Sequence, residues 1–208
     1  MRRLPAAAAW LAMALSSPAL ADTRLDTALN VSQGAIGSSV PDFTFQSADS
    51  GKIALRDLRG KPLLVTMIYT GCADVCPTII ESLAAAAETA EDALGKGSFN
   101  IITIGFDTRN DTPDRMRSFA RAHDAGGSNW YFASSDTKTV NRVSEAVGFN
   151  FFPSAGGFDH MAQVTILDKN GTIYEQVYGG SFEPPTIVEP LKRLVFGHQR
   201  PAFTLAGL

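Results

Sequence analysis

The sequence predicts an α/β fold: a three-layer sandwich with a central mixed sheet, helices on both of its faces and an N-terminal β-hairpin. Two apolar, partly β-branched runs at 63–69 and 100–106 alternate with helical patterns, and the chain then finishes with a hairpin pattern and a helix. Strands that alternate with helices favour a sheet covered on both faces. With 45% hydrophobic residues among 208, the chain can build a full core in one domain.

The first 21 residues are ordered like a secretory signal peptide. Arg2 and Arg3 precede a mostly apolar stretch at 4–15, and Ala19-Leu20-Ala21 has the small-x-small form of a cleavage site. The apolar stretch is shorter than the ~20 residues that a spanning helix needs. We therefore expect cleavage after Ala21, without a stable membrane anchor, and a soluble mature protein that is periplasmic or otherwise exported.

The next segments are expected to be an arm and a hairpin. Residues 22–36 lack strong periodicity, which predicts a flexible arm ahead of a single domain at 37–208. Alternating apolar and polar residues on both sides of Asp-Ser-Gly at 49–51 predict a β-hairpin over 42–58. The run at 63–69 then predicts a central buried strand.

A helix, a strand and a second helix are predicted to follow. The Ala- and Glu-rich stretch 79–94 has high helical propensity, and 100–106 predicts another buried strand. Thr112 before Pro113 predicts the N-cap of a helix that runs to about His123.

The C-terminal part is predicted to complete the sheet and to cover it. Its expected elements are a short strand at 130–133, a helix at 140–147, two strands at 161–167 and 172–178 joined by a tight turn, and a last helix at 185–195.

The two cysteines of the chain, Cys72 and Cys76, lie between the central strand and the following helix, which begins near Pro77. A helix N-terminus favours thiolate over thiol, and thiolates are soft donors that select Cu(I) among other soft metals. The same two thiols can also close a disulfide, although a bridge around so short a loop adds little stability. The pair is therefore predicted to be metal ligands or a redox couple.

Two thiolates need a third donor to make a full metal site, and the chain has three histidines. His198 lies in the C-terminal tail, and His123 is placed to interact with the dipole at a helix C-terminus. His160 follows a Gly-rich loop at 156–159 just ahead of a predicted strand, where a purely structural role is the alternative. With the cysteines present, His160 is the best candidate for the third ligand.

The chain resembles the Sco/SenC family of copper-binding thioredoxin-like proteins over about 36–196. The segments that carry the resemblance are 41–43, 58–62, Tyr-Thr-Gly-Cys-Ala-Asp-Val-Cys-Pro at 69–77, 106–107 with 111–113, and Asp-His at 159–160. The resemblance implies a thioredoxin-like fold and one copper ion, as Cu(I), Cu(II) or both, bound by Cys72, Cys76 and His160. It also implies delivery of copper, or of reducing equivalents, to the binuclear copper centre of cytochrome c oxidase.

The expected partner is a copper-accepting protein, such as a cytochrome c oxidase subunit or another periplasmic copper chaperone. Nucleic acid is excluded because the formal net charge is −3 and there is no basic cluster. Family members commonly keep an N-terminal membrane anchor, whereas this chain is expected to lose its N-terminal segment by cleavage. Four phenylalanines near His160 are expected to form a docking surface or to pack in the core: Phe149, Phe151, Phe152 and Phe158.

The competing prediction is a thiol–disulfide oxidoreductase that reduces the cysteines of the target copper site. The chain lacks the Cys-x-x-Cys spacing and facing proline of thioredoxins, and no proline stands before Cys72 where peroxiredoxins have one. A thiolate of low pKa remains a competent nucleophile nonetheless. Zinc with water as its fourth ligand is a second metal that the three predicted ligands allow.

Overall fold

The computed structural model describes residues 19–197 and contains the predicted mixed sheet. Within this range seven strands form one sheet in the order β2-β1-β5-β4-β3-β8-β9. Their bounds are β1 Thr44–Ser47, β2 Gly51–Ala54, β3 Leu63–Ile68, β4 Asn100–Gly105, β5 Trp130–Ser134, β8 Gln163–Leu167 and β9 Ile173–Tyr178. Strands β3, β4 and β5 are parallel, and the remaining neighbours are antiparallel.

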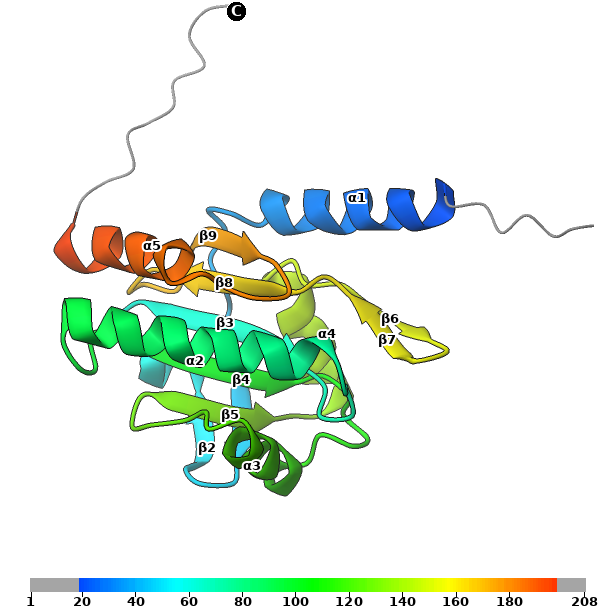
Figure 1. Cartoon of the computed structure of the whole chain (residues 1–208), viewed down its shortest axis with the longest axis horizontal. Helices are drawn as coiled ribbons and strands as arrows, with labels where there is room; N and C mark the ends of the chain where they lie inside the picture. The colour runs from blue at the N-terminus through cyan, green and yellow to red at the C-terminus, as the bar shows by residue number, and fades with distance from the viewer. Residues whose placement is uncertain (1–18, 198–208) are drawn as a thin grey trace, which may run out of the picture.

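Helices cover both faces of this sheet (Figure 1). Helices α2 (Val75–Leu94) and α5 (Pro184–Phe196) pack against each other on one face. The other face presents the side chains of Gln163 and Gln176 to α1 (Ala19–Gly34) and to the end of α4 (Thr137–Ala146). The predicted three-layer α/β sandwich is therefore confirmed.

The central strands position the candidate site. Every residue of β3 is buried, as its apolar, β-branched sequence predicts for a strand covered on both faces. The register runs from Leu63 opposite Asn100 to Ile68 opposite Gly105, so β3 and β4 end side by side. The next residues, Tyr69 and Phe106, are consequently neighbours, with ring centroids 5.3 Å apart.

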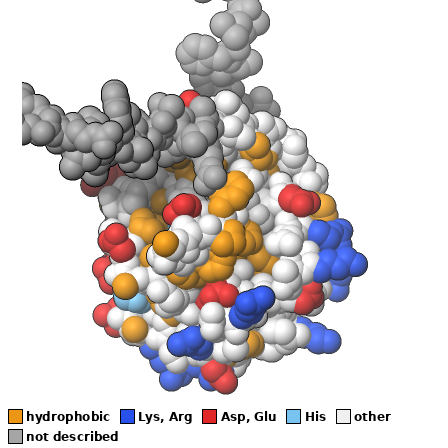
Figure 2. All heavy atoms as spheres, turned by 90° about the vertical axis from the view of Figure 1, so that its right-hand side faces the viewer, with side chains coloured by type: hydrophobic (Ala, Val, Ile, Leu, Met, Phe, Trp, Pro, Cys, Tyr) orange, Lys and Arg blue, Asp and Glu red, His pale blue; other side chains and the backbone are white. Residues whose placement is uncertain are grey.

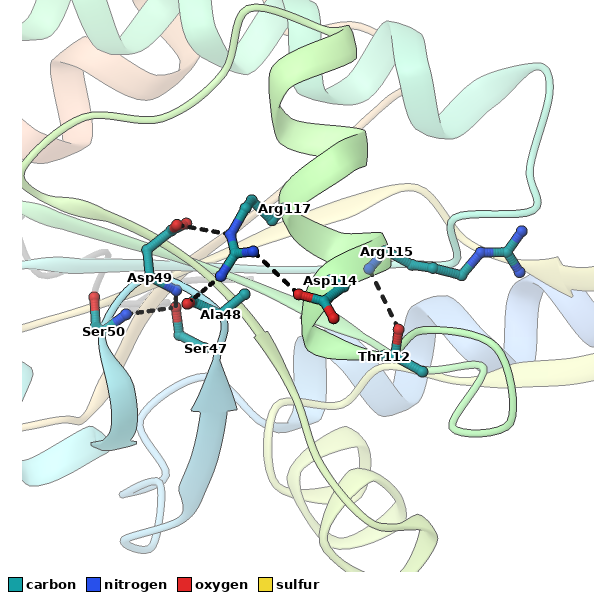
Figure 3. A network of polar contacts seen from close by, with 8 residues as sticks. All are labelled: Ser47, Ala48, Asp49, Ser50, Thr112, Asp114, Arg115 and Arg117. Atoms are coloured by element: carbon teal, nitrogen blue, oxygen red, sulfur yellow. Dashed lines mark hydrogen bonds and ion pairs between the residues drawn. The ribbon is translucent and has the colours of Figure 1, made fainter.

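The N-terminal hairpin is confirmed and is tied to α3 (Pro113–Ala122). The guanidinium of Arg117 in α3 donates to Asp49 at 2.8 Å and to Asp114 at 3.0 Å, and it also contacts the carbonyl of Ala48 in the β1–β2 turn (Figure 3). Thr112 is the N-cap of α3, as predicted, because its hydroxyl accepts the N–H of Arg115 at 3.3 Å. These contacts fix the start of α3, close to the end of β4.

An arm without regular structure was expected at 22–36, and this is wrong because Ala19–Gly34 form helix α1. Its pattern is weak because small or polar residues form part of its buried side, including Ala28 and Ser32, while Leu25 and Val31 are exposed. Ser32 accepts from the Tyr178 hydroxyl and donates to Gln163, both at 3.0 Å. Because hydrogen bonds of Ser32 help to hold α1 in place, its sequence lacks the apolar periodicity from which a helix is predicted.

The signal-peptide prediction rests mainly on residues 1–18, which lie outside the described residues. Helix α1 begins at Ala19, two residues before the expected cleavage point. Among the described residues no helix is long and apolar enough to cross a membrane.

The predicted Gly-rich loop before His160 is a second hairpin. Strands β6 (Phe151–Ser154) and β7 (Gly157–His160) pair antiparallel outside the main sheet. The prediction failed because Pro153 and the glycines of the turn are typical of loops, although proline is tolerated in a strand that has a free edge. His160 therefore ends β7, and the predicted strand after it is β8, which begins at Gln163.

Candidate metal centre

Cys72 and Cys76 flank the start of α2, directly beyond the carboxyl end of β3. Cys72 lies in the connecting loop with 9% of its surface exposed, and Cys76 lies in the first helical turn with 0% exposed. The N–H of Cys76 donates a hydrogen bond to Sγ of Cys72 at 3.4 Å. Free N–H groups at a helix N-terminus stabilise negatively charged groups in this way. Both thiols are free, without a disulfide between them.

The surroundings of the two thiols push their pKa values in opposite directions. Burial raises the pKa of Cys72, but the N–H groups of Cys76 and Asp74 outweigh it, so this pKa lies below the usual range of a thiol. Burial dominates at Cys76 and raises its pKa well above that range. Cys72 therefore forms its thiolate at lower pH than Cys76, which holds its proton more tightly.

His160 reaches the cysteines from the second hairpin. Its Nε2 atom lies 3.9 Å from Sγ of Cys76, and its Nδ1 atom lies 3.4 Å from the carbonyl oxygen of Met161. Burial lowers the pKa of His160, which favours the neutral imidazole that binds metals. A carbonyl on Nδ1 fixes the proton there and leaves Nε2 free toward the thiol.

A cluster of aromatic rings holds this hairpin over the strand ends. Phe106 lies 4.7 Å from Phe151, 5.4 Å from Phe158 and 5.3 Å from the His160 ring, measured between ring centroids. Phe149 is buried in the same cluster, whereas Phe152 is 47% exposed. Of the four phenylalanines near His160, three pack inward and one remains at the surface.

Asp111 is a site residue that the sequence did not reveal as one. Its carboxylate is buried and accepts from the Thr70 N–H at 2.8 Å, the Thr70 hydroxyl at 2.7 Å and the Asp107 N–H at 2.8 Å. Burial raises its pKa despite these bonds. Asp111 thus fixes the main chain two residues before Cys72, and the sequence pointed to it only as part of the segment 111–113 in the family resemblance.

The three predicted ligands are neighbours but do not form a preassembled metal site. Among the residues that the structure describes, no three His, Cys, Asp or Glu side chains are grouped so that they could hold a metal ion. Cys76 contacts both Cys72 and His160, so side chains must move for all three to bind one ion. His123 is bound elsewhere, 2.8 Å from Glu81, and His198 lies outside residues 19–197.

An apolar cavity of about 240 Å³ lies beside His160. It is lined by Leu25, Ala28, Asn150, Phe152, Asp159, His160 and Met161, from α1 and the region of the second hairpin. On the face of the molecule that carries this hairpin, hydrophobic side chains gather near the centre and charged side chains surround them (Figure 2).

Comparisons with known proteins agree with the resemblance. A family model described as SCO1/SenC matches residues 33–196. The SCO1 protein homolog of Bacillus subtilis (strain 168) is 30% identical over 95 residues, which are 45% of this chain and 47% of that protein. The chain therefore matches about half the length of this relative.

Two further proteins are similar over more of the chain. A chloroplastic peroxiredoxin Q of Gentiana triflora is 28% identical over 181 residues, 86% of this chain and 74% of that protein. The structure of Bradyrhizobium japonicum ScoI with copper bound has a TM-score of 0.62 at 23% identity, covering 76% of this chain and 99% of that one. This structural likeness confirms the thioredoxin-like fold.

Proposed function

The chain belongs to the SCO1/SenC family, and from this we propose that it is an exported copper chaperone. It binds one copper ion as cargo through Cys72, Cys76 and His160 and delivers it to a copper-accepting protein. The observation that carries the proposal is the 3.9 Å approach of the His160 Nε2 atom to the Cys76 thiol. Thiol–disulfide exchange requires only the two cysteines, whereas the proposed copper site requires this imidazole as well.

The donor set suits copper and its transfer. Thiolates are soft ligands and imidazole is intermediate, a mixture that both copper states accept. The lowered pKa of Cys72 favours a thiolate and that of His160 favours a neutral ring, whereas the Cys76 thiol, whose pKa is raised, must release its proton when metal binds. A site of three protein donors also keeps a coordination position that a ligand of the recipient can take.

The recipient that we propose is a copper site rich in cysteine, such as the binuclear centre of cytochrome c oxidase that the family resemblance implies. Thiolates of the recipient compete for the soft metal as those of the chaperone do. Another copper chaperone of the same compartment is a further candidate partner.

The second candidate function is reduction of a disulfide in the same recipient. The asymmetry of the thiols favours it, because the pKa of Cys72 is lowered and its side chain is slightly exposed, while the pKa of Cys76 is raised and its side chain is fully buried. The Cys72 thiolate would attack the disulfide of the recipient and form a mixed disulfide, releasing one thiolate. Cys76 would lose its proton, attack Cys72 and release the second thiolate, so that the recipient gains two electrons and this chain holds the disulfide.

One experiment separates the two functions. Copper-loaded parent protein and a His160→Ala variant are mixed with the cysteine-containing copper domain of an oxidase subunit, once in its reduced form and once in its disulfide form. Copper transfer should depend on His160, whereas reduction of the disulfide form by metal-free protein should not. Equal copper transfer by the parent and the variant would contradict the chaperone function.

Export is the remaining part of the proposal. It is supported by the basic start, the apolar stretch and Ala19-Leu20-Ala21. We expect the mature protein to begin at Asp22 and to appear in the periplasmic fraction, which intact-mass measurement after cell fractionation tests. A protein that keeps residues 1–21 in the membrane fraction would contradict it.

A further inference from the structure

Tyr69 stands between the two halves of the candidate metal centre. It directly follows β3, precedes Cys72 by three positions and is buried. Its ring lies edge-on to Phe158 at 5.2 Å and to His160 at 6.1 Å, both of the second hairpin. One side chain of the cysteine segment therefore contacts the hairpin that carries the histidine.

The hydroxyl of Tyr69 lies directly against the turn of that hairpin. A Cβ atom at Gly157 would be only 2.9 Å from the Tyr69 oxygen and 3.1 Å from its Cε2 atom, so the main chain of the turn rests on the phenol. The same hydroxyl is close enough to the backbone of Phe158 and to the thiol of Cys72 for both to affect the pKa of Tyr69. The phenol thus joins one predicted metal ligand to the strand that ends in another.

The β6–β7 hairpin needs contacts with the rest of the protein to be stable. Strands β6 and β7 pair with each other and with no strand of the main sheet within the described part of the chain, and an isolated two-stranded hairpin is marginally stable. The phenylalanines of the cluster contribute contact area without a directional bond. Tyr69 adds a polar contact at a defined point, which can fix how far the hairpin closes over the cysteines.

We propose that Tyr69 is a positioning residue of the metal site: its hydroxyl ties the β6–β7 hairpin to Cys72 and thereby holds His160 against Cys76. The inference rests on the proposed copper-binding function and adds a residue to it. Tyr69 acts on the metal through the placement of His160 and is not itself a ligand. Removal of the hydroxyl should therefore weaken the contribution of His160 and leave the two thiols able to bind.

The test uses Tyr69→Phe, which keeps the ring and removes the oxygen. Its matched control is Tyr178→Phe, because the Tyr178 hydroxyl also makes a hydrogen bond, to Ser32 at 3.0 Å, but lies on β9. Copper affinity of the reduced proteins is measured anaerobically against a competing chelator, in the parent and in a His160→Ala background. Far-UV circular dichroism and thermal unfolding check that each variant folds.

In the parent background Tyr69→Phe should weaken copper binding by about tenfold. This is the smallest loss expected when a group that orients a metal ligand is removed. In the His160→Ala background the same substitution should change the affinity less than about twofold, because the residue through which it acts is gone. Tyr178→Phe should leave the copper affinity unchanged. An unchanged affinity in Tyr69→Phe, or an equal loss in both backgrounds, would overturn the inference.

A second measurement does not depend on copper. In metal-free Tyr69→Phe the amide protons of β6 and β7 should exchange with solvent faster than in the parent, while those of β3 and β4 keep their protection. Unchanged exchange in the hairpin would overturn the inference. If the parent itself binds no copper, the proposed function fails, and hydrogen exchange still decides whether Tyr69 holds the hairpin.

Discussion

The Nε2 atom of His160 lies 3.9 Å from the Sγ atom of Cys76, although the two residues are 84 positions apart in the chain. The contact forms because the β6–β7 hairpin folds over the ends of β3 and β4, where α2 begins. The contact brings together the imidazole of His160, whose pKa is lowered by burial, and the thiol of Cys76, whose pKa is raised by burial. In the proposed metal site, the imidazole is the donor that a simple pair of cysteines lacks.

Replacement of His160 by alanine should weaken copper binding at least tenfold, since even an outer group that orients a ligand is worth that much. The Cu(II) absorption bands should shift as well, because a donor is lost. Competition with a chelator and absorption spectroscopy measure both effects. His123→Ala is the control, because His123 interacts with Glu81 instead; a loss of affinity in the control but not in His160→Ala would refute the assignment.

Copper binding should be gated by the redox state of the cysteines. The reduced protein should take up one equivalent of copper, because neither thiol is held in a disulfide, and the protein with a Cys72–Cys76 disulfide should take up essentially none. Metal analysis after anaerobic reconstitution of both forms is the measurement. Equal copper contents would place the site elsewhere in the chain.

The two thiols should react with iodoacetamide in a fixed order in the metal-free, reduced protein. A lowered pKa means that the Cys72 thiolate forms at lower pH than an ordinary thiolate, and the raised pKa of Cys76 means that its thiolate forms at higher pH. Alkylation of Cys72 should therefore come first and reach half its maximal rate below the usual thiol range. Peptide mass spectrometry across a pH series tests this, and initial labelling at Cys76 would contradict it.

Gly157→Ala should destabilise the second hairpin. Gly157 has a φ of +120°, and an added Cβ would lie 2.9 Å from the Tyr69 oxygen; such strain and crowding cost about 2 kcal/mol together. Urea unfolding measures the loss, and copper affinity should fall with it. Gly156→Ala is the matched control, because its Cβ would meet no atom within 4 Å, and an equal loss in both variants would refute the close-contact explanation.

Asp111→Ala should loosen the cysteine loop. It leaves the N–H groups of Thr70 and Asp107 without their acceptor, at a cost of about 2 kcal/mol, and copper affinity should decrease. Asp136→Ala removes a comparable bond, to the N–H of Thr139 at 2.9 Å, from the start of α4. This control should destabilise the start of α4 without changing copper affinity.

The sequence was sufficient where local pattern decides structure. The apolar strands, the turn at 49–51, the cap at Thr112 and the cysteines at a helix start all follow from neighbouring residues. Of the three histidines, the sequence favours His160 as the third ligand, and the structure places His160 beside Cys76. Whether all three ligands close around copper remains a prediction.

The features that the sequence did not reveal depend on contacts between distant segments. Helix α1 is held partly by Ser32, a residue without any apolar signal. The second hairpin is rich in loop-forming residues and is stabilised by aromatic rings from other elements. Tyr69 belongs to a strand pattern, and nothing in that pattern indicates that its hydroxyl meets the turn at Gly157.

The hydrogen bonds of Ser32 have a consequence for expression of shortened fragments. The resemblance to the family begins at about residue 36, but the Tyr178 hydroxyl and the Gln163 side chain both bond Ser32. A fragment cut at residue 36 would uncover part of β8 and β9 and leave these polar groups to solvent. The smallest fragment that folds like the whole protein should therefore include α1, so a recombinant fragment that starts at Asp22 is the better choice.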